Sequence, residues 1–131
     1  MANILVVEDY PDNLALMTYL LSVAGHEVRG AVTGRQTVAT AREDLPDIVV
    51  LDIQLPDMDG YQVLSELRAD PSTASVPIVA VTAYAMVGDR DDALAAGFDG
   101  YLPKPITPRT FAQTIENYLR TPVATTESRE A

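Results

Sequence analysis

Four consecutive apolar residues, Ile-Val-Val-Leu at positions 48–51, constrain the fold of this chain more than any other stretch of the sequence. The run is too short for a helix and too uniformly apolar for a half-exposed strand, so it predicts the buried central strand of a parallel sheet. It ends on the carboxylate of Asp52, and burying an unpaired charge costs on the order of several kcal/mol. We therefore expect Asp52 to emerge at the carboxyl end of this strand, where it can be chemically active.

A short apolar strand followed by a helix is a pattern that recurs along the whole chain. Besides residues 48–51, we expect strands at 3–7, 27–32, 76–81 and 100–103, and helices at 12–24, 34–45, 60–69, 87–96 and 107–119. Parallel strands need a helix in each crossover, and right-handed crossovers place helices on both faces of the sheet. The sequence therefore predicts an α/β fold, a five-stranded parallel sheet in the flavodoxin-like order 2-1-3-4-5 within a three-layer (βα)5 sandwich.

Local signals place the ends of several of these elements. Asp12 or Asn13 is the expected N-cap of the first helix, and Gly25 is the residue expected to end it. Helical spacing places Leu45 on the inward face of the second helix. Residues 121–131 have few apolar side chains and no periodicity, so we expect a folded domain over residues 1–120 and a flexible C-terminal tail after it.

The composition excludes several classes of function. The chain has no cysteine, which excludes disulfides, thiolate metal sites and cysteine nucleophiles. Its formal net charge of -10 would repel nucleic acid phosphates and anionic membranes, and no basic patch offsets that charge. No apolar stretch is long enough to span a bilayer, and no basic signal-peptide region precedes the first strand. We therefore expect a cytoplasmic protein that binds neither nucleic acid nor membrane.

Polar residues close or follow four of the expected strands. They are Glu8, Asp9, Asp52, Thr82 and Lys104. Because the strands of a parallel sheet end at the same edge, we expect these side chains to face one crevice. Three crowded carboxylates raise one another's pKa values unless a cation lies between them. An all-oxygen site without His or Cys suits a hard ion, so the pattern indicates Mg²⁺.

The same cluster is suited to accepting a phosphoryl group. Asp52 can attack as a nucleophile to give an acyl phosphate, while a metal ion, the Thr82 hydroxyl and the Lys104 ammonium bind the transferring oxygens. Taken singly, an Asp or a Lys at a strand end is more often a solvated end than a functional group. The conjunction of all five residues at strand ends favours the functional interpretation.

The sequence contains four motifs, VVED, VVLDIQLPDMDG, AVTAYA and YLPKPI. Together they resemble the response-regulator receiver domain (CheY-like), the phosphoacceptor of bacterial two-component signalling, over about residues 3–120. The resemblance implies that Asp52 is the phosphorylated residue. It also implies that Mg²⁺ is bound by Glu8, Asp9, Asp52 and the backbone carbonyl of Gln54.

The resemblance further implies how a signal would leave the domain. Phosphorylation of Asp52 would draw the Thr82 hydroxyl inward and let Tyr101 turn from an outward to an inward position. This alters the face made by the fourth helix, the fifth strand and the fifth helix, which a downstream protein would read. Lys104 matches the lysine of the family, and we expect a cis peptide bond between Lys104 and Pro105. The implied phosphodonor is a histidine kinase or a histidine phosphotransfer protein.

Within the family, the sequence looks closest to single-domain regulators of the DivK type and to receivers attached to hybrid histidine kinases. Both alternatives stay open at this point. A domain of either kind is a phosphoacceptor switch and not an enzyme. Self-phosphorylation from small phosphodonors and slow self-dephosphorylation are the most that it would catalyse.

Other classes of function fit the residues less well. A metal-dependent phosphohydrolase also forms an aspartyl phosphate, but such enzymes carry a second Asp two residues after the nucleophile, and that position here is Gln54. A binding module that keeps the fold without taking phosphate is disfavoured because all five site residues are present. His26 is the only histidine, and it follows a helix-ending glycine at the start of an edge strand. We expect it to be an inert surface residue and not a phosphohistidine.

Overall fold

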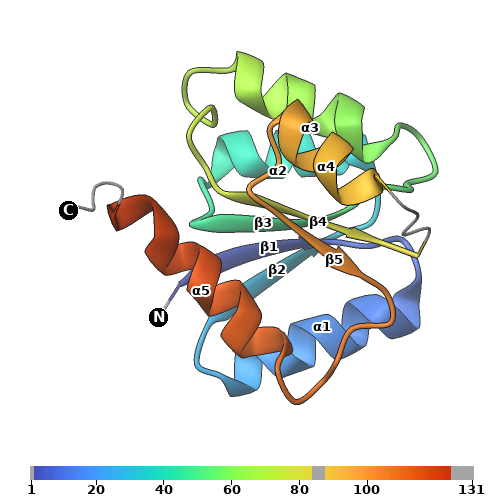
Figure 1. Cartoon of the computed structure of the whole chain (residues 1–131), viewed down its shortest axis with the longest axis vertical. Coiled ribbons are helices and arrows are strands. Elements are labelled where there is room, and N and C mark those ends of the chain that lie inside the picture. Colours follow the sequence, from blue (N-terminus) through green and yellow to red (C-terminus); the bar gives the residue numbers. More distant parts are fainter. Residues whose placement is uncertain (1, 84–87, 125–131) are drawn as a thin grey trace.

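The structure is a computed structural model that describes residues 2–83 and 88–124, with residues 120–124 as backbone only. This part of the chain forms five strands alternating with five helices (Figure 1). The strands are β1 Asn3–Val7, β2 Glu27–Ala31, β3 Ile48–Asp52, β4 Ile78–Thr82 and β5 Gly100–Pro103. The helices are α1 Pro11–Val23, α2 Gly34–Glu43, α3 Gly60–Ala69, α4 Asp89–Ala96 and α5 Phe111–Ala124.

The strands form one parallel sheet in the order β2-β1-β3-β4-β5. Helices α1 and α5 cover one face of the sheet, and α2, α3 and α4 cover the other (Figure 1). The expected doubly wound, three-layer α/β fold is therefore confirmed. Every residue of β3 and β4 is buried because both faces of these strands are covered.

The apolar core is divided into two clusters by the sheet. The cluster beneath α2, α3 and α4 includes Leu5, Val49, Leu51, Leu64 and Leu67. The cluster beneath α1 and α5 includes Ile4, Met17, Leu21, Phe111 and Ile115. Each fully buried aliphatic side chain of this size contributes roughly 1.5–3 kcal/mol. The central strands are thus a rigid platform for the residues at their ends.

The first helix begins earlier than expected. Pro11 is its first residue and Tyr10 is its N-cap, so the prediction of Asp12 or Asn13 at the N-cap is wrong. A proline suits the first helical position because its φ is already helical and its missing N–H has no partner within the helix. Gly25 lies just past the helix end with φ of 100°, as expected for the residue that stops it.

Several other boundaries differ from the expectation, and three of them change how a segment is placed. Helix α2 ends at Glu43, which leaves Leu45 53% exposed instead of inward. Strand β4 begins at Ile78, after Pro77. Helix α5 begins at Phe111 and not at 107, because a turn with a hydrogen bond from the Thr110 N–H to the Thr107 carbonyl precedes it.

Two predictions reach beyond the described part of the chain. The fourth helix was expected to start at Val87, which lies outside the described residues; α4 begins at Asp89 after Gly88, whose φ is 91°. Helix α5 continues to Ala124, past the expected domain boundary at 120, and residues 125–131 lie outside the described residues. Within residues 2–83 and 88–124, no helix combines the length and apolar character that a membrane crossing requires.

Candidate functional site

The carboxyl edge of the sheet gathers the polar residues that close its strands. Asp52 is the last residue of β3, Thr82 is the last residue of β4, and Glu8 and Lys104 directly follow β1 and β5. In the sheet register Asp52 lies opposite Val81, and Thr82 lies opposite Pro103. The parallel topology therefore brings residues that are up to about a hundred positions apart in sequence to one edge, as expected.

Lys104 joins the acidic side chains at this edge. Its Nζ lies 2.7 Å from Glu8 Oε1 and 3.2 Å from Asp52 Oδ2. The side chains of Glu8 and Asp52 are only 1% and 4% exposed, so both carboxylates are held away from water. Backbone amides bind their remaining oxygens: the Gln54 N–H donates to Asp52 Oδ1 at 3.0 Å, and the Tyr10 N–H donates to Glu8 Oε2 at 3.2 Å.

The acidic residues fit a hard divalent cation. Glu8, Asp9 and Asp52 each place a carboxylate oxygen within 4.8 Å of the others, and Asp9 is exposed whereas the other two are buried. Lys104 contacts Glu8 and Asp52, and Asp9 adds a third carboxylate, so this group of four side chains carries excess negative charge, and two of its carboxylates are buried. A small oxygen-seeking cation such as Mg²⁺ would balance that charge with the donor set it prefers.

The surroundings shift the proton affinity of two of these groups. Burial raises the pKa of Glu8, and the charge of Asp52 acts in the same direction, against the hydrogen bonds from Lys104 and the Tyr10 N–H. Burial alone would lower the pKa of Lys104, but its hydrogen bond to Glu8 and the charge of Asp52 raise it above its ordinary value. Lys104 is therefore a permanent cation at neutral pH.

The residues beside Asp52 and Lys104 are also placed as expected. Thr82 is 3% exposed, and its carbonyl accepts a hydrogen bond from the Lys104 N–H at 2.8 Å. The Lys104–Pro105 peptide bond is cis, which confirms that prediction. Asp52, Thr82 and Lys104 thus lie close together at the carboxyl ends of three neighbouring strands.

Tyr101 lies on β5, away from the acidic cluster. Its side chain is 6% exposed and packs in the core cluster beneath α4, with Ala93 and Phe98. Its hydroxyl is buried and has no hydrogen-bond partner in the part of the chain that the structure describes. The described position of Tyr101 is therefore the inward one.

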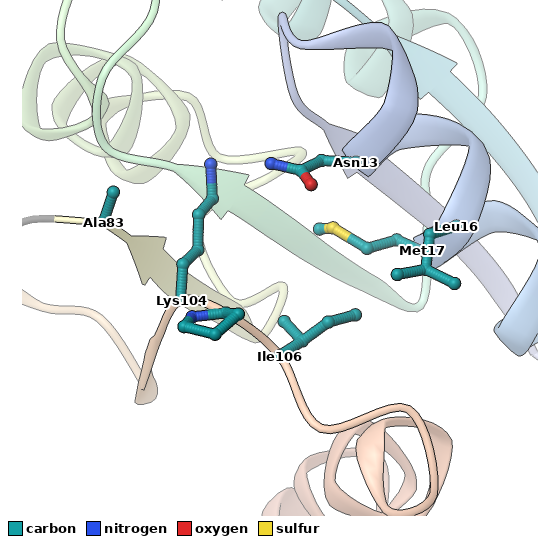
Figure 2. A pocket seen from close by; sticks show the side chains of 7 residues that line it. Asn13, Leu16, Met17, Ala83, Lys104 and Ile106 are labelled. Atoms are coloured by element: carbon teal, nitrogen blue, oxygen red, sulfur yellow. The ribbon is translucent and has the colours of Figure 1, made fainter.

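A cavity of about 430 Å³ opens beside Lys104. Asn13, Leu16 and Met17 of α1 line one side of it, and Ala83, Lys104, Pro105 and Ile106 line the other. Figure 2 shows the side chains of Asn13 and Lys104 converging across this space, with Leu16, Met17 and Ile106 forming its apolar part. The sequence pattern had not indicated this cavity, because the spacing of Met17 on α1 indicates only a core residue.

Two residues have roles that the sequence did not predict. His26 was expected to be an inert surface residue, but its side chain is 9% exposed, its Nε2 lies 2.8 Å from Glu116 Oε2, and its Nδ1 accepts the Ala2 N–H at 3.1 Å. It links the start of the sheet to α5. The carboxylate of Asp57 accepts hydrogen bonds from two backbone amides of α2, a contact that the sequence pattern did not indicate. Contacts between residues so far apart leave no local signal in a sequence.

The chain is similar to known proteins over most of its length. Residues 4–116 match the family model of the response regulator receiver domain. The polar-differentiation response regulator DivK of Brucella ovis is 36% identical over 117 residues, which are 89% of this chain and 95% of that protein.

Two solved structures resemble the fold closely. The chemotaxis response regulator CheY4 of Vibrio cholerae has a TM-score of 0.84 and 28% identity, over 90% of this chain and 98% of that one. The receiver domain of the sensor histidine kinase PA1611 of Pseudomonas aeruginosa has a TM-score of 0.83 and 34% identity, over 92% and 98%. In the PA1611 structure a magnesium ion is coordinated in the active site cleft.

Proposed function

Because this chain belongs to the response regulator receiver domain family, as its motifs predict, we propose that it works in a phosphorelay with Asp52 as the phosphoacceptor. The observation that carries this proposal is the setting of Asp52. Its carboxylate ends the central strand, is buried, and is held by Lys104 at 3.2 Å and by the Gln54 N–H at 3.0 Å beside two other acids.

Phosphoryl transfer at this site is a single displacement at phosphorus. A carboxylate oxygen of Asp52 attacks the phosphorus of a phosphohistidine, and the O–P bond forms as the N–P bond breaks. The imidazole nitrogen leaves with the bonding electrons and takes up a proton. The Gln54 N–H and Lys104 fix the orientation of the carboxylate before attack, and Lys104 and the Thr82 hydroxyl bind phosphoryl oxygens in the product.

Mg²⁺ would be held by Glu8, Asp9, Asp52 and the backbone carbonyl of Gln54. When bound, it supplies positive charge that neutralises the transferring phosphoryl oxygens. The oxygen-only donor set and the excess of carboxylates support this assignment. Glu8 is already buried, so little further desolvation is needed when it binds the ion.

The proposed output is a change in the face formed by α4, β5 and α5. Phosphorylated Asp52 draws in the Thr82 hydroxyl, and the space this leaves favours the inward position of Tyr101, the position described here. The switch then requires a second, outward position of Tyr101, and phosphorylation shifts the balance between the two. A coupling of about 1–3 kcal/mol suffices for such a shift. A downstream protein that contacts this face would sense it.

The phosphodonor in this proposal is a histidine kinase or a histidine phosphotransfer protein. Two of the similar proteins named above, the response regulator DivK and the receiver domain of a sensor histidine kinase, support a stand-alone regulator and a kinase-attached receiver alike. The net charge of -10 supports a cytoplasmic domain that works through protein contacts, without binding nucleic acid or membrane. We also propose a receiver domain over about residues 1–120, with α5 continuing to Ala124, and a flexible C-terminal tail after the helix.

A receiver domain of this family is a signalling switch and not a metabolic enzyme. In this proposal its own chemistry is limited to self-phosphorylation from small phosphodonors and slow loss of the phosphoryl group. A phosphohydrolase would need an acid-base group at position 54, where Gln54 cannot transfer a proton.

Intact-protein mass measurement tests the proposal. Acetyl phosphate with Mg²⁺ should add one phosphoryl group to the wild-type chain and none to Asp52→Asn. Equal labelling of the variant would refute the assignment of Asp52. A steady-state assay on small phosphate esters separates the two functions, because sustained turnover would favour the phosphohydrolase.

A further inference from the structure

One carboxylate ties the segment that follows Asp52 to a distant helix. Asp57 Oδ1 accepts a hydrogen bond from the Gly34 N–H at 2.7 Å, and Asp57 Oδ2 accepts one from the Arg35 N–H at 3.0 Å. These are the first two amides of α2, which have no partner within the helix and must find one outside it. Asp57 therefore caps α2 from a segment more than twenty residues further along the chain.

The N-terminus of α2 has a second cap, which comes from the residue directly before the helix. Thr33 is the N-cap, and its Oγ1 accepts a hydrogen bond from the Gln36 N–H at 3.1 Å. Thr33 and Asp57 thus satisfy different amides of the same helical turn. Only Asp57 belongs to the segment that follows the phosphoacceptor, so the two contributions can be separated by mutation.

Apolar packing holds the same segment against α2. The Cα of Gly34 faces the side chain of Met58 so closely that a Cβ at position 34 would collide with it and would also lie 2.9 Å from Val63 Cγ2. Met58 in turn packs on the core cluster beneath α2, α3 and α4. The segment and the helix terminus are therefore in direct contact through both polar and apolar groups.

The other side of the segment is fixed to the site itself. The Gly60 N–H donates to the Ile53 carbonyl at 2.6 Å, and Gln54 and Asp59 pair as an isolated antiparallel bridge. Asp59 and Gln62 form a capping box at the start of α3. Residues 53–59 thus form a short closed loop that contacts the N-termini of both α2 and α3. Gln54, near the start of this loop, lies next to the acidic cluster.

We propose that Asp57 is a positioning residue for the phosphoacceptor site, because its contact with α2 fixes the 53–59 loop and thereby the Gln54 carbonyl and the Asp52 carboxylate. This inference rests on the function proposed above. Binding free energies are reciprocal, so a contact that favours Mg²⁺ binding is itself strengthened when Mg²⁺ binds. The N-terminus of α2 is then stabilised when Mg²⁺ binds, although α2 contributes no ligand to the ion.

The test compares Asp57→Ala with Thr33→Ala in the full chain. Both variants remove a cap from the same end of α2, so both should lower the urea midpoint of unfolding. Titration calorimetry with Mg²⁺ alone should give a dissociation constant that is raised about 10-fold in Asp57→Ala and unchanged in Thr33→Ala. A loss of affinity of about 10-fold is typical when a residue that orients the ligands of a metal site is removed. Equal dissociation constants in the two variants would overturn the proposal.

Salt separates positioning from simple loss of a negative charge. Screening lengths fall from about 10 Å at 0.1 M to about 3 Å at 1 M ionic strength. A positioning effect keeps the ratio of the Asp57→Ala and wild-type dissociation constants at both salt concentrations. A ratio that falls to one at high salt would mean that charge alone explains the effect, and the proposal would be wrong.

Hydrogen exchange of single amides tests the reciprocal effect in the wild-type chain. Saturating Mg²⁺ should slow exchange of the Gly34 and Arg35 amides more than that of the Gln36 amide, which Thr33 binds. Equal change at all three amides would contradict the proposal.

The Mg²⁺ measurements need no phosphoryl transfer. A wild-type chain that binds Mg²⁺ but is never labelled on Asp52 therefore overturns the proposed function and leaves the role of Asp57 at the Mg²⁺ site standing. A wild-type chain that binds no Mg²⁺ overturns both.

Discussion

The amino and carboxyl edges of the sheet each hold a polar cluster built around one cation, and the two clusters differ in charge balance. At the amino edge, Arg68 donates to the carbonyls of Ala74, Val76 and Gly97 at 2.6–3.0 Å and to Asp99 Oδ2 at 2.9 Å. The same oxygen of Asp99 accepts the N–H of Ile78, the first residue of β4, at 2.8 Å. One guanidinium thus faces one carboxylate, and its other partners are neutral.

The carboxyl edge is unbalanced. Lys104 pairs with Glu8 and Asp52, and the Asp9 carboxylate lies near both acids, so three negative charges stand against one positive charge. A cluster with balanced charge joins elements firmly and needs no ligand. A cluster with excess negative charge is stabilised further when it binds a cation, and the bound cation can in turn bind a phosphoryl group. The amino-edge cluster therefore supports the structure, and the unbalanced charge at the carboxyl edge fits the reactivity proposed for it.

Arg68→Ala should have the largest effect on stability. It removes four hydrogen bonds from a charged donor and leaves Asp99 without its cation, which we expect to lower the free energy of unfolding by about 3 kcal/mol. Urea unfolding measures this. Mg²⁺ affinity should stay within a factor of two of wild type, and a large loss of affinity would show that the two edges are not separate.

Lys104→Ala should have a smaller effect on stability that depends on metal. Without Mg²⁺, the variant leaves two buried carboxylates unpaired and should lose about 2 kcal/mol, less than a fully buried pair because Glu8 can take up a proton. Added Mg²⁺ should stabilise the variant at least as much as the wild type. Phosphorylation should no longer change the environment of Tyr101, and an unaltered response in the tyrosine fluorescence would contradict the role given to Lys104.

The pH dependence contributed by Asp57 is the smallest expected effect. The N–H groups of Gly34 and Arg35 lower the pKa of Asp57 below its usual 3.8. A carboxylate with a lowered pKa stabilises the folded state above its unfolded pKa, and this contribution is lost as pH falls through the folded value. The difference in urea midpoint between wild type and Asp57→Asn should therefore be constant above about pH 5 and shrink below pH 3.8. A difference that grows with acid would contradict this.

The sequence predicted the fold and the carboxyl-edge cluster for the same physical reason. Uniformly apolar runs such as that of β3 mark strands buried on both faces, and a polar residue directly after such a run must lie at the sheet edge. Asp52, Thr82 and Lys104 are each next to their strand in sequence, so local pattern and parallel topology together locate them. The resemblance to receiver domains added the assignment of their roles.

The features that the sequence did not predict depend on pairs of distant residues. The partners of Arg68, the contact of His26 with Glu116 and the cap that Asp57 places on α2 each join elements whose relative placement no local pattern gives. Helix boundaries failed for a related reason. Asp12 and Asn13 are good N-cap residues, but Pro11 is the first helical residue, which places the N-cap at Tyr10.

The position of the phosphoryl group in the labelled chain tests the central claim most directly. Borohydride reduces an acyl phosphate to an alcohol, which converts a phosphorylated aspartate to homoserine. After treatment with acetyl phosphate and Mg²⁺, then borohydride, peptide sequencing by mass spectrometry should find homoserine at position 52 alone. Aspartate at position 52 in a chain that carries the phosphoryl group elsewhere, on His26 for example, would contradict the account.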